Sequence, residues 1–401
     1  MYTRRDKIAN IDYIYIWTFL VSMLVFIYFN FEGFWVGEVE KHTGMTITDN
    51  TERIKSICRL IMIITSLMFF HRTYSINKLT ALGKTLLIFS LYLLLSCFLL
   101  KDFNNITHYI STYTIMSVWI FIYLFFYTLC LRYEIDKYIN KFVVFFTIFS
   151  AILFIRNYIL NIGIGHTDWH YIESYYVITL IPAFLLLQNK YKYSLLILTM
   201  ICAIISAKRT GLITSVIVII IYFILIGKNI GKKIKSILLG ATILVTLYFT
   251  MATFMGEQLD FIIERIANIE EDDGSGRGDM YTNLFDEITK NDDTATYLFG
   301  NGYDEVINSK INSGYSAHNE FLEVLYDYGL VGFSIFTAIF IAIYNMSKKT
   351  KEHKHKVSVQ LSLLIFIMFS LTSHTILYTT NIIFLCMFWG YNDARNKILK
   401  Y

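Results

Sequence analysis

The strongest constraint on the fold is a series of apolar runs, most of them near 20 residues long, that recurs along the whole chain. Wound as an α-helix at about 1.5 Å per residue, such a run matches the roughly 30 Å hydrocarbon core of a bilayer. Lipid offers the backbone no hydrogen-bond partner, so the runs are expected to cross it as helices. They predict about twelve spans, at 11–31, 54–70, 79–100, 110–131, 139–160, 171–188, 191–206, 210–226, 234–254, 319–346, 357–373 and 375–391.

Composition supports this interpretation. Hydrophobic residues make up 55% of the 401, Pro182 is the single proline, and the mean hydropathy of +0.51 is high for a soluble protein. The sequence therefore predicts an all-α, polytopic membrane protein. The close pairs of runs near 189 and 374 leave re-entrant hairpins open as an alternative. The first run is too long for a signal peptide and is expected to be a retained span.

Charge predicts the orientation. Lysine and arginine gather in alternate loops, which is the pattern that holds those loops in the cytoplasm, so both termini are expected there. The same distribution argues against a nucleic-acid partner, despite a net charge of +4. The five cysteines lie in or at the ends of apolar runs, without a CxxC pair, so neither a disulfide, nor a zinc site, nor any other cofactor is expected.

One long segment on the other face, Met255–Ala317, carries 14 acidic residues against four basic ones. It divides the chain into spans 1–9 (1–254), a large extracytoplasmic loop (255–317) and spans 10–12 (318–401). Helical spacing of apolar residues predicts short amphipathic helices near 259–266 and 281–288. The glycines between them, Gly274–Gly278, predict a turn that brings Arg277 to a helix start. The acidic cluster Glu270–Asp273 is expected to be solvated, so no metal site is assigned.

Some charges break the expected pattern. Lys208 and Arg209 lie in a short link on the outer face, where the alternatives are a role toward substrate and simple snorkelling to lipid headgroups. Arg277 either faces a ligand or pairs with an aspartate beside it. Arg156 and Glu173, at membrane depth, either line a cavity or pair with one another.

The stretch Ser316–Phe333 reads SAHNEFLEVLYDYGLVGF and is expected to be the point where the loop enters a membrane helix. A small polar residue, Ser316, predicts the helix start, with His318 and Asn319 in the first turn. The positive end of a helix disfavours an imidazolium, which would leave a neutral ring able to accept a proton. The alternative is an interfacial histidine with no chemical role.

These features stand in one order: Arg209-Thr210-Gly211-Leu212, then Arg277 with Tyr281 four residues on, a Gly-Asn-Gly turn at 300–302, His318-Asn319, and Gly329-Leu330-Val331-Gly332. Over 205–335 this resembles the superfamily of O-antigen polymerases and O-antigen ligases, the Wzy and WaaL type of membrane glycosyltransferase. Two departures are Tyr281, where a tryptophan is common, and Lys208, whose added charge leaves open which of the two cations faces substrate.

The resemblance implies an undecaprenyl-diphosphate-linked oligosaccharide as substrate, at the periplasmic face of a bacterial inner membrane. Arginines suit a departing diphosphate and a neutral histidine suits an attacking hydroxyl, so His318, Arg277 and Arg209 are the predicted catalytic residues. Predicted substrate contacts are Lys208, Tyr281, Asn319, Arg156 and Glu173. With two arginines supplying charge, a metal-independent, inverting transfer is expected. A chain-length regulator and a flippase are the protein partners that the resemblance implies, beside the bilayer.

Three functions stay open at this stage. A polysaccharide polymerase is favoured because the chain is rich in Ile, Lys, Asn, Phe and Tyr, as AT-rich polysaccharide gene clusters encode. An O-antigen ligase would use the same residues with a lipid A core acceptor. A lipid-linked oligosaccharide flippase is disfavoured because no internal repeat is visible and the unusual charges lie at the outer ends of spans.

Overall fold

The computed structural model describes residues 10–43, 50–73, 79–99, 106–162, 173–187, 189–206, 208–226, 273–290, 293–303, 305–308, 316–373 and 381–399, with single positions between 231 and 264. Within these residues the chain is helical and contains no strand, which confirms the all-α class. The helices are α1 (Asn10–Thr43), α2 (Thr51–Thr73), α3 (Ala81–Leu99), α4 (Ile106–Arg132), α5 (Asp136–Ile162), α6 (Ser174–Ile178), α7 (Ile181–Phe184), α8 (Asn189–Ile205), α9 (Arg209–Ile226), α12 (Asp273–Lys290), α13 (Thr294–Phe299), α14 (Glu305–Asn308), α15 (Glu320–Lys349), α16 (His353–Thr372) and α17 (Ile383–Ile398).

The described residues include six helices long and apolar enough to cross a membrane, belonging to α1, α2, α4, α5, α15 and α16. Four shorter apolar helical segments accompany them. This confirms a multi-pass membrane protein, while the count of about twelve stays a prediction because most of the run at 234–254 lies outside the described residues. The predicted span at 171–188 is interrupted: a turn at Thr179 and Leu180 separates α6 from α7, and Pro182 falls in the first turn of α7, where its missing N–H costs little.

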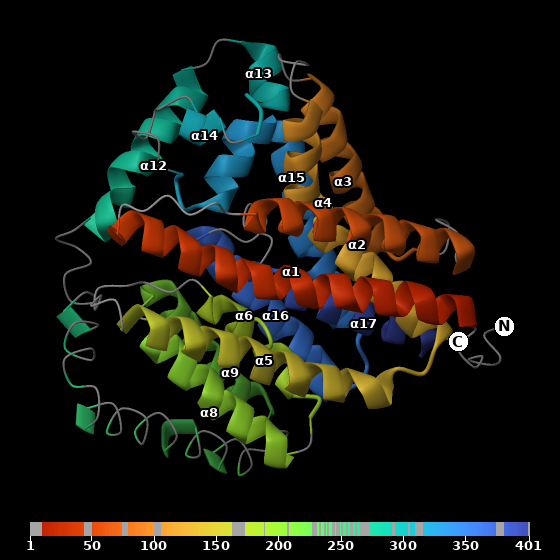
Figure 1. Cartoon of the computed structure of the whole chain (residues 1–401), viewed down its shortest axis with the longest axis vertical. Helices are drawn as coiled ribbons and strands as arrows, with labels where there is room; N and C mark the ends of the chain where they lie inside the picture. Colours follow the sequence, from red (N-terminus) through yellow and green to blue (C-terminus); the bar gives the residue numbers. More distant parts are fainter. Residues whose placement is uncertain are drawn as a thin grey trace.

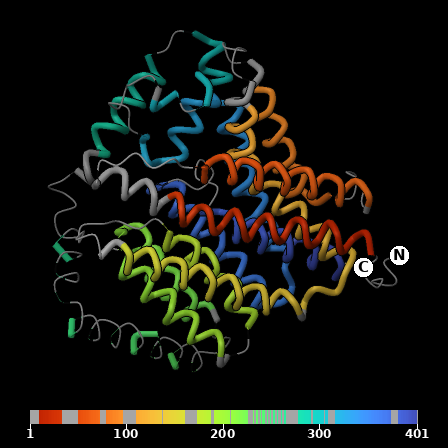
Figure 2. The backbone as a smooth tube through the Cα atoms, viewed as in Figure 1, coloured from red at the N-terminus to blue at the C-terminus, as the bar shows by residue number. Residues whose placement is uncertain are grey.

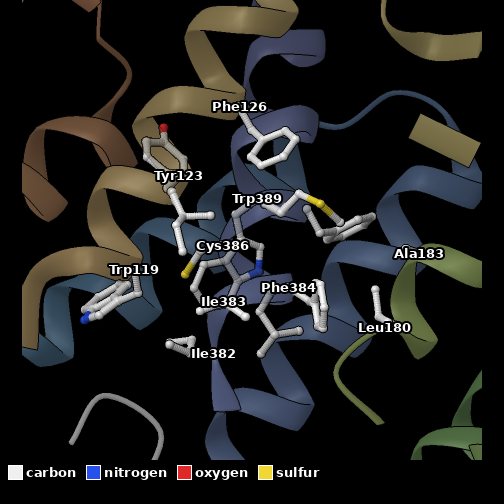
Figure 3. Close-up of a cluster of buried hydrophobic side chains, with 14 of the residues drawn as sticks. Trp119, Tyr123, Phe126, Leu180, Ala183, Ile382, Ile383, Phe384, Cys386 and Trp389 are labelled. Atoms are coloured by element: carbon white, nitrogen blue, oxygen red, sulfur yellow. The ribbon is translucent and has the colours of Figure 1, made fainter. Parts of the chain in front are cut away.

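The core is centred on α4, which is buried along 94% of its span. Figure 3 shows Trp119, Tyr123 and Phe126 of α4 facing Ile383, Phe384 and Trp389 of α17. At Gly390 a Cβ would lie 2.5 Å from the backbone oxygen of Tyr123, so this glycine permits the close approach of the two helices. Aromatic side chains fill the remaining space, and the result is a tightly packed scaffold for the peripheral helices.

A polar layer joins several helix ends at one end of the molecule. Asp12, at the start of α1, is fully buried and accepts from Arg72 at 3.1 Å and from Arg132 at 2.9 Å, at the ends of α2 and α4. At the same end, Tyr391 of α17 donates to Asp136 at the start of α5. The starts of α1 and α5 thus meet the ends of α2, α4 and α17, as up-and-down connections require.

The other helices surround this scaffold (Figure 1). The helices α12, α13 and α14 lie together at one end, against α15, while α5, α8 and α9 pack together on the opposite side of α1. The backbone trace in Figure 2 shows the start of α1 and the end of α17 on the same side of the molecule, away from α12. The loop helices therefore lie apart from the polar layer of Asp12.

A sharp bend divides α15. Gly329 has φ 62° and ψ −171°, which interrupts the helix between Tyr328 and Leu330. A Cβ at Gly329 would lie 2.5 Å from the backbone of Leu298, because the Gly-Asn-Gly turn at 300–302 crosses here. Glycine is required where backbones approach this closely and φ is positive.

The turn also satisfies carbonyl groups of the bent helix. Asn301 donates its N–H to Tyr326 O at 3.1 Å and Gly302 donates to Asp327 O at 2.9 Å. The hydroxyl of Tyr92, from α3, donates to Tyr328 O at 2.6 Å. Carbonyls near a helix break need partners outside the helix, and these three donors supply them. The two glycine motifs that stand about 30 residues apart in sequence are therefore one structural unit.

Candidate functional site

The site is organised by the start of α15. The helix begins at Glu320, and the side-chain oxygen of Asn319 accepts from the N–H groups of Phe321 at 3.1 Å and Leu322 at 3.3 Å. Asn319 has extended backbone and is therefore the N-cap. The prediction that Ser316 starts the helix, with His318 and Asn319 in its first turn, is wrong, because the backbones of His318 and Asn319 are not helical and the Asn319 side chain accepts from the first N–H groups of the helix.

His318 immediately precedes this cap. Its φ of 52° makes it the non-glycine residue with a left-handed backbone in the part of the chain that the structure describes. Such a conformation costs about 1–3 kcal/mol and persists only where surrounding contacts enforce it. The side chain is partly exposed. The left-handed backbone thus places the imidazole of His318 directly before the start of α15, next to the Asn319 cap.

Tyr281 holds α12 against this cap. Its side chain is half-buried and forms a hydrogen bond with the side chain of Asn319. Burial raises the pKa of Tyr281, while nearby Arg277 and the bond to Asn319 act in the opposite direction. Tyr281 and Arg277 are four residues apart in α12, so they share one helix face. A single face of α12 therefore carries a cation and the contact to the residue beside His318.

Arg277 reaches toward the end of α16. Its Nη1 donates to the carbonyl oxygen of Thr372 at 3.1 Å, which leaves the guanidinium partly exposed. The structure corrects one expectation here: Gly274–Gly278 is not a turn but the first part of α12, which begins at Asp273. Glycine weakens a helix by only about 1 kcal/mol per residue relative to alanine, and an acidic residue, Asp273, stands at the positive N-terminal end of the helix.

Tyr175 of α6 connects Arg277 with the start of α9. Its buried hydroxyl is hydrogen-bonded to the side chains of Thr210 and Ser373, and it interacts electrostatically with Arg277. Thr210 directly follows Arg209, the first residue of α9. A Cβ at Gly211 would lie 2.9 Å from the ring of Tyr175, so this glycine makes room for the tyrosine. Tyr175 was not singled out in the sequence because a tyrosine within an apolar run carries no distinguishing signal.

Lys208 and Arg209 both lie at the start of α9, as predicted for a short link. The N–H of Lys208 donates to Ser206 Oγ at 3.4 Å, and its carbonyl oxygen accepts from Leu212 at 3.0 Å. Both side chains are partly exposed. The backbone of Lys208 is therefore fixed by the link, while Arg209 begins the helix beside Tyr175.

Arg156 and Glu173 do not pair with one another. Arg156 forms an ion pair with Glu32 of α1, with 2.7 Å between Nη1 and Oε2. Glu173, only 4% exposed, receives a contact of 3.4 Å from Asn157 Nδ2. The alternative of a mutual pair is wrong because Arg156 points across to α1. Their predicted contact with substrate remains a prediction.

The first half of α15 also carries three buried carboxylates that sequence reasoning missed. Glu320 is fully buried, and Glu323 and Asp327 are each 2% exposed. Ser370 donates to Glu320 Oε2 at 2.9 Å, and the N–H of Ala317 donates to Glu323. The spacing of three and four residues puts them on one helix face, and this spacing was the available signal. They place buried negative charge in the half of α15 that follows His318.

Among the described residues, no three His, Cys, Asp or Glu side chains gather into an arrangement that could hold a metal ion. The polar groups that contacts link are instead Arg277, the hydroxyls of Tyr175 and Tyr281 and the side chain of Asn319, with Arg209 and His318 as chain neighbours of Thr210 and Asn319. Such a set can bind an anion and move a proton.

Comparison with known families adds an independent finding. The model of a family described as O-antigen ligase matches residues 194–337, a segment that runs from α8 through α12, α13 and α14 to the first half of α15. No curated protein matches the chain. The family match contains Arg209, Arg277, Tyr281, His318 and Asn319, and it confirms the predicted resemblance to the superfamily of O-antigen polymerases and ligases.

Proposed function

With residues 194–337 matching the O-antigen ligase family, we propose that this membrane protein is a polysaccharide polymerase. It transfers a growing glycan from undecaprenyl diphosphate to the non-reducing-end sugar of another lipid-linked repeat unit. The observation that carries the proposal is the convergence at Tyr175: this tyrosine bonds to the helix start that Arg209 opens, and it lies within the electrostatic reach of Arg277.

In the proposed reaction, a hydroxyl of the acceptor sugar attacks the anomeric carbon of the donor glycan. His318 takes the hydroxyl proton as the new glycosidic bond forms. The bond between the anomeric carbon and the diphosphate oxygen breaks, and the electron pair leaves with undecaprenyl diphosphate. A single displacement of this kind inverts the anomeric configuration.

Arg209 and Arg277 stabilise the departing diphosphate, since guanidinium groups donate paired hydrogen bonds to phosphate oxygens and are charged at every working pH. Because these two cations supply the positive charge, the proposed reaction needs no metal. Asn319 positions His318 through the helix cap, and Tyr281 fixes Asn319 in turn. Lys208, Arg156 and Glu173 are proposed to contact the substrate.

An O-antigen ligase is the second candidate, because the matching family is described as O-antigen ligase. A ligase would keep the same donor site and the same roles for His318, Arg209 and Arg277. Only the acceptor would differ: the core oligosaccharide of lipid A in place of a second lipid-linked repeat unit.

The test measures glycan transfer by the purified protein in lipid bilayers, with a chelator in the buffer. Lipid-diphosphate-linked repeat units are supplied alone or together with lipid A core. We expect a ladder of longer glycans from repeat units alone, and its loss in His318→Ala, Arg277→Ala and Arg209→Ala. Removing a group that stabilises developing charge is expected to lower the rate by about 10²–10³-fold. Lys290→Gln, which removes an exposed cation from the same helix as Arg277, is the matched control.

Transfer only to lipid A core would establish the ligase instead. Normal ladders from the folded alanine variants would refute the assignment of the site. Loss of the ladder in the presence of chelator, with recovery on adding a divalent cation, would refute the metal-independent mechanism.

A further inference from the structure

Two cations of α2, outside the site described above, lie buried at an unexpected place. Lys55 is 8% exposed and Arg59 is 5% exposed, in the first turns of α2, at the end opposite Arg72. The predicted alternation of spans assigns this end to the extracytoplasmic face, together with α12. Charges at such depth are costly and usually face a partner or a ligand. Both stand in or beside an otherwise apolar run, so their burial leaves no distinguishing pattern in the sequence.

Among the described residues, Glu52 is the acidic side chain that pairs with Lys55 and Arg59. Glu52 forms an ion pair with Lys55, and its Oε2 lies 4.0 Å from Arg59 Nη2. The Glu52 side chain is 66% exposed, so water screens it. Arg59 donates to Ser56 Oγ at 2.8 Å, and its buried Nε has no hydrogen-bond partner among the described residues. In the part of the chain that the structure describes, one solvated carboxylate thus serves two buried cations, and the Nε of Arg59 is left without an acceptor.

The surroundings hold these cations in place. The guanidinium of Arg59 lies 5.9 Å from the ring centre of Phe26 in α1. Gly33, also in α1, has no side chain, and a Cβ there would lie 3.1 Å from Lys55 Nζ. Arg59 also interacts electrostatically with Tyr303, the residue that follows the Gly-Asn-Gly turn on α15. Arg59 therefore lies near the turn that packs against the bend of α15, the helix that His318 precedes.

A surface groove lies between α2 and α4, on the neighbouring face of α2; Lys55 and Arg59 do not line it, and Ser56 connects it to Arg59. Its volume is about 580 Å³, and its lining consists of Glu52, Arg53, Ser56, Ile57, Leu60, Ile110, Ser111 and Thr114. The aliphatic side chains of the groove are exposed on the outer surface of the helices, the surface expected to face lipid. A third cation, Arg53, lies at the polar end of the groove. Ser56 belongs both to the groove and to the hydrogen bond of Arg59. A lipid with one long chain and an anionic head matches this distribution of charge.

We propose that Lys55 and Arg59 bind the diphosphate of a second lipid-linked saccharide, the acceptor, with part of its prenyl chain in the groove between α2 and α4. This inference rests on the proposed function, because transfer between two lipid-linked molecules requires two diphosphate sites and Arg209 and Arg277 supply only the first. The planar guanidinium of arginine donates to phosphate oxygens through its Nε–H as well as its Nη–H groups. The unpartnered Nε of Arg59 therefore gains an acceptor when the lipid binds.

The experiment measures binding rather than turnover. Wild-type protein in phosphatidylcholine nanodiscs is titrated with undecaprenyl diphosphate that carries no sugar, and the bound equivalents are counted by native mass spectrometry. We expect two equivalents. Lys55→Gln and Arg59→Gln are expected to weaken one of them by about tenfold or more, and Arg277→Gln the other. Arg59→Lys, which keeps the charge, retains part of the affinity. Lys84→Gln, an exposed cation of α3, is the matched control and keeps both equivalents.

A single equivalent in wild type, or two unchanged equivalents in Lys55→Gln and Arg59→Gln, overturns the proposal. A parallel titration with phosphatidylglycerol distinguishes the sources of lipid phosphate: displacement of the second equivalent at equal concentration makes this a phospholipid site and also overturns the proposal. If Arg59→Gln does not fold, Lys55→Gln and Arg59→Lys decide the outcome. Failure of the proposed function is recognised separately, as a protein that binds two equivalents and forms no ladder.

Discussion

At the scale of single residues, tyrosines position the charges of this site. Tyr175 bonds to Thr210 and Ser373 and interacts with Arg277, and Tyr281 bonds to Asn319. The bond of Tyr281 also connects α12 to the helix cap next to His318, while its predicted contact with substrate stays a prediction.

The first prediction concerns Tyr281→Phe, which removes this hydroxyl and nothing else. We expect the free energy of unfolding to fall by about 1 kcal/mol, the usual net value of one hydrogen bond. Because the pKa of Tyr281 is raised in the folded protein, its stabilising contribution is intact below about pH 10 and is lost as the pH rises through the folded pKa. Thermal unfolding in detergent across this pH range checks both effects.

The direction of the pH effect on stability distinguishes wild type from Tyr281→Phe. Wild type should lose stability relative to Tyr281→Phe as the pH rises above about 10. Tyr297→Phe, which changes an exposed tyrosine of α13, serves as the control and should show no such trend. A gap between wild type and Tyr281→Phe that stays constant across the range would contradict the burial of the hydroxyl.

At the scale of elements, α15 is defined by the Asn319 cap at one end and a bend ten residues later, at Gly329. Helices α12 and α14 pack on the first half through a small apolar cluster of Leu284, Val306, Ala317 and Tyr326. The second half enters the scaffold of α3 and α16. The bend therefore joins the segment that follows His318 and the Asn319 cap to the segment that packs among the apolar helices.

Asn319→Ala tests the cap. Loss of the side-chain acceptor for the N–H groups of Phe321 and Leu322 is expected to cost about 1 kcal/mol of stability. It should also lower the transfer rate, because His318 stands on the backbone that the cap fixes. Asn319→Asp keeps an acceptor and should retain most of the stability. Equal stability of the two variants would show that capping is not the role of this residue.

Gly329→Ala tests the bend. A Cβ at this position would lie 2.5 Å from the backbone of Leu298, at a φ of 62° that disfavours side chains. We expect a loss of about 2 kcal/mol or more, measured as a lower unfolding temperature and increased proteolysis of α13. Gly256→Ala is the matched control, since no atom lies within 4 Å of its added Cβ. Comparable unfolding temperatures for both variants would refute the requirement for glycine at 329.

At the scale of the whole molecule, the polar layer around Asp12 and the helices α12, α13 and α14 occupy different ends. Charge alternation predicts that the first end is cytoplasmic and the second extracytoplasmic. The buried ion pairs of Asp12 close the helix ends on one side. The proposed chemistry and both cation sites lie on the other side, where lipid-linked glycans would be presented.

Labelling of single cysteines tests this orientation. Lys290→Cys and Lys348→Cys place thiols on exposed positions of α12 and of the end of α15. A membrane-impermeant thiol reagent applied to cells with a permeable outer barrier should label Lys290→Cys and not Lys348→Cys until the inner membrane is opened. Burial of Cys58, Cys130, Cys202 and Cys386 limits the background from these four of the five native cysteines. Labelling of Lys348→Cys alone in sealed cells would invert the topology.

The sequence by itself determined the all-α membrane class, because apolar length and charge alternation are local properties that lipid acts on directly. It also indicated His318, Arg209 and Arg277, since each breaks a local pattern and belongs to a motif. Only the tertiary structure decided how these groups meet. Tyr175, the carboxylates of α15, and Lys55 with Arg59 acquire meaning from partners hundreds of residues away or from burial, and a hydrogen bond or a desolvated charge across such a separation leaves no periodicity in the sequence.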